Sequence, residues 1–260
     1  MRRVDPRQLL LPGLTVDATD RSKAGIRITL DASALAAITR GRQPVDCAGA
    51  MPCDTPIRAL EYAIVDVETT GGSFGRGHRI TEIAAVRLSG DGRVVDEYRT
   101  LVNPERPIPF YITALTSITG QMVADAPRFA EVSGAVAGVL RGAVFVAHNA
   151  AFDWRFVSAE LDRAGVPLSG RTLCTVRLAR KVVPEVRSRS LDSLAFFFNI
   201  PNAARHRAYG DAVATAELFR RLLDRLDSLE VTHWQQLEQL LRQRAKRRKR
   251  RANPHFVSEI

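Results

Sequence analysis

The stretch YAIVDVETTGG (62–72) decides the fold, because its pattern predicts one buried strand with two carboxylates near its end. Its first residues, Tyr62 to Val65, form a short apolar run, and two glycines close the stretch. Asp66 and Glu68 stand two residues apart at the carboxyl end, so both side chains project from the same face of the strand. Such a pair also fits an exposed strand end. Carboxylates are nevertheless unfavourable inside a strand unless something binds them, and open α/β sheets hold their ligands at this end.

Two further strands follow directly. The segments Ile80 to Leu88 and Val94 to Val102 are both apolar and rich in β-branched residues, and Gly90-Asp91-Gly92 forms a turn between them. Such a short connection predicts an antiparallel meander. The glycine-rich GGSFGRG (71–77) is not a nucleotide-binding loop, because the segment after it reads as a strand rather than a helix.

The rest of the central region alternates between helical and strand patterns. Helical spacing is expected over Phe129 to Leu140, Phe152 to Ala164, Ser190 to Phe198 and Asp211 to Leu226, and strands over Val144 to Ala147 and Leu173 to Val176. An antiparallel meander followed by alternating helices and strands predicts an α/β fold with a mixed five-stranded sheet flanked by helices.

The chain divides into three expected parts. Residues 1–57 form an N-terminal extension that ends in a linker, residues 58–227 form the main domain, and residues 228–260 form an amphipathic helix with a basic tail. The last helix, expected from Val231 to Ala245, carries an apolar stripe that packs either on its own domain or on a partner.

Positive charge is concentrated at the C-terminus. The net charge is +10, of which residues 242–260 carry +7 and residues 58–241 only +1. A dense basic segment such as KRRKRR (246–251) favours polyanions, because each neutralised phosphate releases counterions. A solvated tail and a nuclear import signal are the alternatives for this segment.

Neither cysteines nor apolar runs point to an extracytoplasmic protein. Cys47, Cys53 and Cys174 have no spacing typical of a disulfide framework or a zinc site. No apolar run approaches the ~18 residues of a membrane span, and the N-terminus does not resemble a secretory signal. We therefore expect a cytoplasmic, nucleoid-associated protein with no membrane partner.

Two more carboxylates stand beside histidine-bearing motifs. Asp153 lies in HNAAFD (148–153) and Asp211 in HRAYGDA (206–212), each at the start of a predicted helix. Either could simply favour a helix N-terminus. If they converge with the first pair, two charges ~4 Å apart repel by ~4 kcal/mol at an effective dielectric of ~20. Two Mg²⁺ or Mn²⁺ ions would relieve that repulsion and could promote phosphodiester hydrolysis.

Two histidines stand in these motifs. With an ordinary pKa of ~6.5, His206 is suited to accept a proton from an attacking water at neutral pH. His148 sits at a strand end, and we expect it to organise the following turn.

These residues resemble the DEDD family of 3′→5′ exonucleases in its histidine subtype, including the proofreading epsilon subunit of bacterial DNA polymerase III. The resemblance covers roughly residues 60–227. It depends on DVETTG, RITEIAAVRL, LVNPERPIP, ITG, VAHNAAFD, TLCTVRLAR, SLDSLAFFFNI and HRAYGDA. The tyrosine subtype has a tyrosine four residues before the last aspartate, where this chain has Arg207.

The resemblance implies a ribonuclease H-like fold, two divalent ions and a set of site residues. Its metal ligands would be Asp66, Glu68, Asp153 and Asp211, with His206 as general base. The positions near the terminal nucleotide would be Thr69, Leu115, Ile118 and Asn149. Loop hydrogen bonding is an equally good explanation for Thr69 and Asn149.

The implied function is a metal-dependent exonuclease that releases nucleoside 5′-monophosphates from single-stranded or frayed 3′ ends of DNA, in proofreading or repair. RNA 3′-end trimming and a non-catalytic nucleic-acid-binding module are the alternatives. A DNA polymerase or a sliding clamp is a possible partner, and QLLLPG (8–13) loosely resembles a clamp-binding peptide. The 57 residues before the domain and the basic C-terminus depart from the epsilon pattern.

Overall fold

The structure is a computed structural model that describes residues 14–16, 28–30, 44–201 and 204–243. The clamp-like segment 8–13 and the basic run 246–251 lie outside the described residues. Among the residues that are described, no helix has the length and apolarity needed to cross a membrane.

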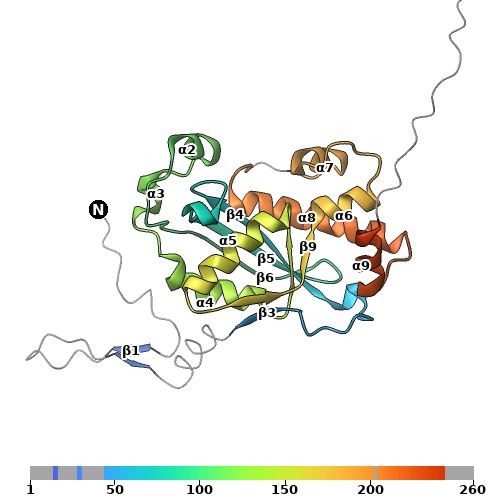
Figure 1. The fold of residues 1–260 in the computed structure, drawn as a ribbon, viewed down its shortest axis with the longest axis horizontal. Helices are drawn as coiled ribbons and strands as arrows, with labels where there is room; N and C mark the ends of the chain where they lie inside the picture. The colour runs from blue at the N-terminus through green and yellow to red at the C-terminus, as the bar shows by residue number, and fades with distance from the viewer. Residues whose placement is uncertain (1–13, 17–27, 31–43, 202–203, 244–260) are drawn as a thin grey trace, which may run out of the picture.

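A mixed five-stranded sheet forms the centre of the molecule, as expected, in the order β6-β5-β4-β7-β9 (Figure 1). The meander consists of β4 (Glu61–Thr69), β5 (Ile80–Ser89) and β6 (Val94–Leu101), which pair antiparallel. On the other side of β4, β7 (Val144–Ala147) and β9 (Thr172–Cys174) pair parallel to it. The carboxyl ends of β4, β7 and β9 therefore lie at one edge of the sheet.

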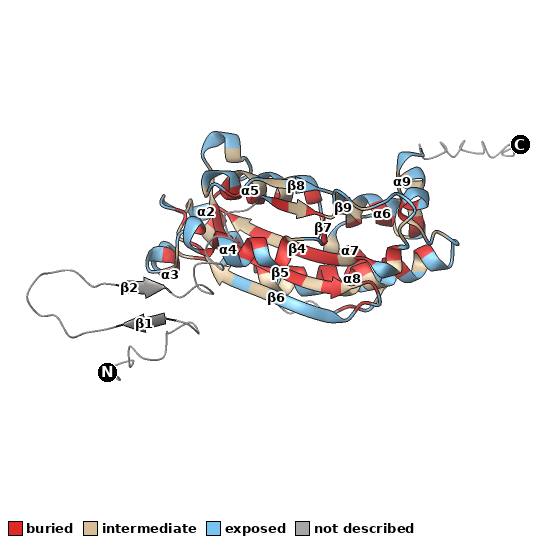
Figure 2. Cartoon of the chain, turned by 90° about the horizontal axis from the view of Figure 1, so that it is seen from below, coloured by how far each residue is buried: buried red, intermediate tan, exposed pale blue. Residues whose placement is uncertain are grey.

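Helices cover both faces of the sheet, and the alternation along β4 explains why. Tyr62 and Ile64 belong to one apolar core with α6 (Thr175–Val182), α7 (Leu191–Phe197) and α8 (Ala208–Asp227). Ala63 and Val65 belong to the opposite core with α4 (Phe129–Leu140) and α5 (Ala150–Arg163). Figure 2 shows the buried residues between these layers.

Besides the short strand β1 (Leu14–Val16), three α-helices and two short strands in the main body were not predicted. The helices are α2 (Phe110–Thr116), α3 (Gly120–Ala124) and α6, and the strands are β3 (Val45–Cys47) and β8 (Leu168–Gly170). The fifth strand was expected to reach Val176, but it ends at Cys174, and Val176 is already in α6. A helix forms there because Leu178, Ala179 and Val182 recur at helical spacing and are buried.

The end of the expected N-terminal extension packs on the main domain. β3 pairs parallel to β8, and Val45 and Cys47 are fully buried. Farther out, only the antiparallel pair β1 (Leu14–Val16) and β2 (Ile28–Leu30) is described.

The last described helix, α9 (Trp234–Arg242), returns to the main domain. Trp234 and Leu237 are buried in the core that contains α6 and α8, so the apolar stripe packs on its own domain. The N–H of Ile57 donates to the carbonyl of Thr232 over 2.8 Å, which ties the segment before β4 to the segment before α9.

Candidate metal centre

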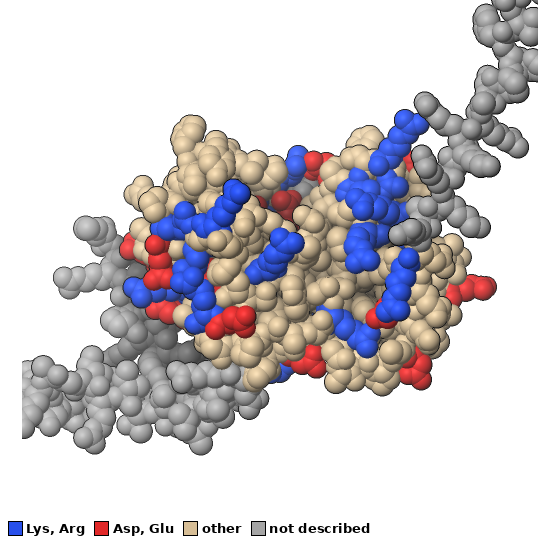
Figure 3. Space-filling view, viewed as in Figure 1, with Lys and Arg blue, Asp and Glu red and all other residues tan. Residues whose placement is uncertain are grey.

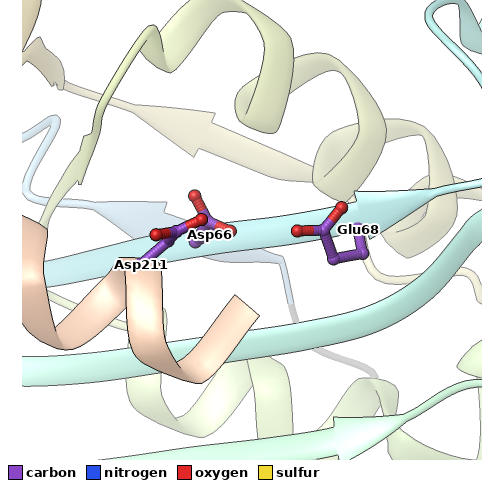
Figure 4. A group of neighbouring side chains, drawn as sticks. All are labelled: Asp66, Glu68 and Asp211. Carbon is purple, nitrogen blue, oxygen red and sulfur yellow. The ribbon is translucent and has the colours of Figure 1, made fainter. Parts of the chain in front are cut away.

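Three of the predicted carboxylates meet at the carboxyl end of β4. Asp66 and Glu68 project from one face of the strand, and Asp211 comes from the first turn of α8, which packs on that face (Figure 4). One carboxylate oxygen from each of the three lies within 4.8 Å of the other two. Residues more than 140 positions apart in sequence are therefore close enough to share a cation.

The fourth predicted carboxylate, Asp153, lies beside this group. It belongs to the first turn of α5 and is buried, with 3% of its surface exposed. The backbone N–H of Val67 donates to its Oδ1 over 3.3 Å, which holds the carboxylate against β4. Its charge also raises the pKa of Asp66, but its oxygens are not within the 4.8 Å grouping of the other three.

The protonation of these carboxylates reflects their crowding. Burial raises the pKa of Asp66 well above its ordinary value, and repulsion from Asp153, Asp211 and Glu68 adds to this effect. Burial and the charge of Asp211 raise the pKa of Glu68 to about 7. For Asp153, burial outweighs two backbone hydrogen bonds and raises the pKa to about 8.

This electrostatic cost indicates what the cluster can bind. Without cations, the repulsion is relieved when the carboxylates bind protons, which is why their pKa values are raised. Divalent cations would relieve the repulsion while the carboxylates stay ionised. All the donors are carboxylate oxygens, which are the hard ligands that Mg²⁺, Mn²⁺ and Ca²⁺ prefer. The residues present therefore fit a divalent cation.

His206 stands next to the cluster through its backbone. Its φ of 56° places it in the left-handed region, and its N–H donates to Oδ2 of Asp211 over 3.0 Å. This bond orients the Asp211 carboxylate at the start of α8. The imidazole is half-buried, and its role as a general base stays a prediction.

Glu82 and Arg207 are site residues that the sequence reasoning missed. Glu82 on β5 is buried and accepts from Arg207 Nη2 over 2.7 Å and from the N–H of Ala208 over 2.9 Å. It thus anchors the first residue of α8, which carries Asp211. The signal was present, because Glu82 is the one acidic residue in the apolar strand RITEIAAVRL.

His148 was expected to organise the turn after β7, but its ring instead joins the end of β7 to the start of α6 and to the segment before α7. Its Nδ1 lies 2.8 Å from Oγ1 of Thr175 and its Nε2 lies 3.0 Å from the carbonyl of Arg189. A carbonyl can only accept, so Nε2 carries the proton and Nδ1 accepts from the hydroxyl. Burial lowers the pKa of His148, which keeps the ring neutral.

The four residues expected near substrate have different environments. Thr69 is buried and its hydroxyl donates to the carbonyl of Gly71 over 2.8 Å, in agreement with loop hydrogen bonding. Asn149 is exposed, with φ of 76°, and its side chain does not cap α5. Leu115 on α2 is 52% exposed, whereas Ile118 is fully buried. Of these last two, only Leu115 is accessible from the surface.

The recess that holds the acidic side chains lies between exposed apolar residues. Figure 3 shows acidic side chains recessed between the parts of the molecule that carry α2 and α7. Phe110 and Tyr111 on α2 and Phe196 on α7 are 87%, 62% and 88% exposed. Exposed rings of this kind can stack on nucleobases.

Comparison with known proteins connects this geometry to one family. The family model described as exonuclease matches residues 63–219. The chain is 43% identical over 182 residues to a DNA polymerase III subunit epsilon-like protein of Rhodobacter capsulatus, which covers 69% of this chain and 26% of that protein. It is 36% identical over 200 residues to the 3′-5′ exonuclease DinG of Bacillus subtilis, covering 76% and 20%.

Longer polymerases and solved exonucleases are also similar. A PolC-type DNA polymerase III of Caldanaerobacter subterraneus is 37% identical over 184 residues, which is 71% of this chain and 13% of that protein. The match thus spans about a quarter or less of these three relatives. Exonuclease X in complex with 5′ overhanging duplex DNA aligns with a TM-score of 0.52 at 31% identity, covering 70% of this chain and 99% of that one. Exonuclease I shares the fold at 18% identity with a TM-score of 0.57, over 65% of this chain and 43% of that one.

Proposed function

This chain belongs to the exonuclease family, and from that premise we propose that it is a metal-dependent 3′→5′ exonuclease acting on DNA. The observation that carries the proposal is the meeting of Asp66, Glu68 and Asp211 within 4.8 Å at the carboxyl end of β4. The raised pKa values of Asp66 and Glu68 further indicate that the ionised cluster is electrostatically unfavourable without cations. A protein that only binds nucleic acid does not require such an unfavourable cluster of carboxylates.

Each residue of the centre has a role in this reaction. Asp66, Glu68, Asp153 and Asp211 would hold two Mg²⁺ or Mn²⁺ ions, which supply charge neutralisation for an in-line displacement at phosphorus. His206 takes a proton from the attacking water as general base. Asp211 and His206 are coupled through the bond between the His206 N–H and the Asp211 carboxylate, so their positions depend on each other.

The substrate proposal rests on the surfaces around the centre. We take the 3′-terminal nucleotide to lie between the exposed Leu115 and Asn149, with the rings of α2 and α7 available for stacking. The DNA-bound Exonuclease X relative favours DNA over RNA. The epsilon-like and PolC-type relatives support the further proposal that the protein works in proofreading or repair with a polymerase as partner, at the nucleoid.

The test is to incubate 5′-labelled single-stranded DNA and RNA of the same sequence with the protein and Mg²⁺ or Mn²⁺. Stepwise shortening of DNA from the 3′ end, with release of nucleoside 5′-monophosphates, is the expected result. Asp66→Ala should abolish it, because Asp66 lies at the centre of the carboxylate group.

Two outcomes would contradict the proposal. Binding of DNA without shortening would favour the non-catalytic module, and shortening of RNA alone would favour RNA trimming. Asp96→Ala is a suitable control, because this exposed carboxylate on β6 has no part in the cluster. Its activity should equal that of the unchanged protein.

A further inference from the structure

A basic cavity lies at the same edge of the sheet as the carboxylates. Its volume is about 480 Å³, and it lies beside β9 between α5 and α6. Its lining includes Asn149, Trp154, Arg155, Thr172, Arg177 and Arg180, and no aspartate or glutamate lines it. A cavity with three guanidinium groups and no carboxylate has a strongly positive local potential.

The three arginines are not used to hold the fold together. Arg155 on α5 and Arg177 and Arg180 on α6 are all exposed. Within the described part of the chain, none of the three forms an ion pair, whereas Arg79 and Arg207 pair with buried glutamates. Their charges are therefore available to a ligand.

The helices that carry these arginines fix where they point. The buried residues of α6 are Thr175, Leu178, Ala179 and Val182. Arg177 and Arg180, three positions apart, therefore share the opposite face. Arg155 lies across the cavity on α5. Figure 3 shows Lys and Arg side chains over both parts of this face, with few acidic side chains between them.

The cavity begins close to the candidate metal centre. Asn149 and Ala150 line it, and Asp153 follows Ala150 by three residues, a rise of about 4.5 Å along α5. β9 is two strands from β4 in the sheet, which corresponds to about 10 Å. A nucleic-acid strand whose 3′-terminal nucleotide lies at the carboxylates can therefore reach the cavity within a few nucleotides.

The positive surface also leads toward the basic end of the chain. Lys181 on α6 donates a hydrogen bond through Nζ to the carbonyl of Gln243, the last described residue. The sequence continues from there with RAKRRKRR (244–251). Basic side chains thus run from the second turn of α5, along α6, to the residue after which the basic segment begins.

We propose that Arg155, Arg177 and Arg180 form a phosphate track that binds the backbone of the nucleic-acid strand upstream of its 3′ terminus. The inference deepens the proposed function and rests on it for the position of that terminus. Guanidinium groups suit phosphate oxygens, and exposed arginines contact the backbone without reading the bases. The track binds the nucleic-acid strand whatever its base sequence and keeps its 3′ end directed at the carboxylates.

The test is binding of a single-stranded DNA oligonucleotide in a chelator, where the strand stays intact. Replacing all three arginines with alanine should weaken affinity on the order of tenfold and lower the slope of log K against log salt by about 2, at about 0.7 per lost phosphate contact. Replacing them with lysine should restore most of the affinity, because the charge returns. The control removes three other exposed arginines, Arg93, Arg163 and Arg221, and should leave the slope unchanged.

Activity separates this proposal from the function on which it rests. Hydrolysis of a nitrophenyl ester of a nucleoside 5′-monophosphate, which has no upstream phosphate, should be unchanged in the alanine variant, while shortening of the oligonucleotide slows. An unchanged affinity and salt slope in the alanine variant would overturn the track, whatever the activity. A protein that shortens no strand but loses binding with the arginines would keep the track and overturn the exonuclease.

Discussion

Asp66 lies among four other carboxylates. Burial and repulsion from Asp153, Asp211, Glu68 and Glu82 all raise its pKa. The sequence could predict most of this crowding, because the four predicted ligands each stand at a strand end or a helix start, but it missed the contribution of Glu82 on β5. It could not predict that Asp153 would lie slightly apart, since the hydrogen bond from Val67 that positions it joins residues 86 positions apart.

His206 provides the first prediction at this scale. His206→Ala should lower kcat by about 10²–10⁴-fold, the usual contribution of a general base, with little change in KM. Kinetics on single-stranded DNA measures both values. His233→Ala, which changes a half-buried histidine at the start of α9 that is not part of the carboxylate cluster, is the control. Full kcat in the His206 variant would remove it from the reaction.

Glu68 provides a prediction about stability and pH. Its pKa is about 7 in the folded protein against 4.5 ordinarily, so the metal-free protein loses stability as pH rises from about 4.5 through 7. Glu68→Gln cannot ionise and escapes this loss. With allowance for partial exposure, the free energy of unfolding of the variant should exceed that of the unchanged protein by about 1–2 kcal/mol at pH 8 and equal it at pH 4.

Thermal unfolding in a chelator across this pH range measures the difference. Adding Mg²⁺ or Mn²⁺ at pH 8 should raise the Tm of the unchanged protein more than that of the variant, because the variant lacks one ligand charge. Parallel stability curves for the two proteins would contradict the raised pKa.

The start of α8 is the element on which the centre depends. Its first N–H and the preceding Arg207 both donate to Glu82 on β5, and the His206 N–H donates to Asp211 one turn later. Strand and helix are thus joined beside the carboxylates. The sequence predicted the helix, and Glu82 stood out as a lone acidic residue in an apolar strand, but its pairing with Arg207, 125 positions later, leaves no local pattern.

Glu82→Ala should therefore affect both stability and rate. Loss of a buried partner of Arg207 and of the Ala208 N–H should reduce the free energy of unfolding by about 1–3 kcal/mol. It should also lower kcat more than it raises KM, because Asp211 and His206 shift. Chemical denaturation and kinetics together test this.

The matched control for that experiment lies farther along α8. Glu217 pairs with Arg220 and Arg221 near the surface, so Glu217→Ala should cost less than about 1 kcal/mol and leave kcat intact. Equal effects of the two alanine variants would show that Glu82 does not position the site.

Element bounds were predicted best for four elements of the main domain. The bounds of α4 and β7 agree with the expectation, and β5 and β6 differ by one residue. In contrast, α2, α3 and α6 have five to eight residues, too few to establish a helical period from the sequence. α6 matters most among these, because it carries two of the track arginines.

At the scale of the whole molecule, distant segments close the domain. β3 pairs with β8, and α9 packs beside α6, so parts of the expected extension and tail region complete the cores. The apolar pattern alone left the place of α9 open between its own domain and a partner. Only the three-dimensional contacts resolved it.

The basic segment after Gln243 should extend the binding surface. Replacing KRRKRR (246–251) with six glutamines removes six positive charges and keeps the length of the chain. Affinity for single-stranded DNA should fall and its salt dependence should flatten, because fewer counterions are released. A salt slope equal to that of the unchanged protein would show that this segment does not contact phosphate.

The most direct measurement is a crystal structure of the protein soaked with Mn²⁺, with the ions located by their anomalous scattering. We expect two peaks about 3.5–4 Å apart, contacted by Asp66, Glu68 and Asp211 with Asp153 completing the site. Soaked crystals that show no peak among these carboxylates would contradict the account.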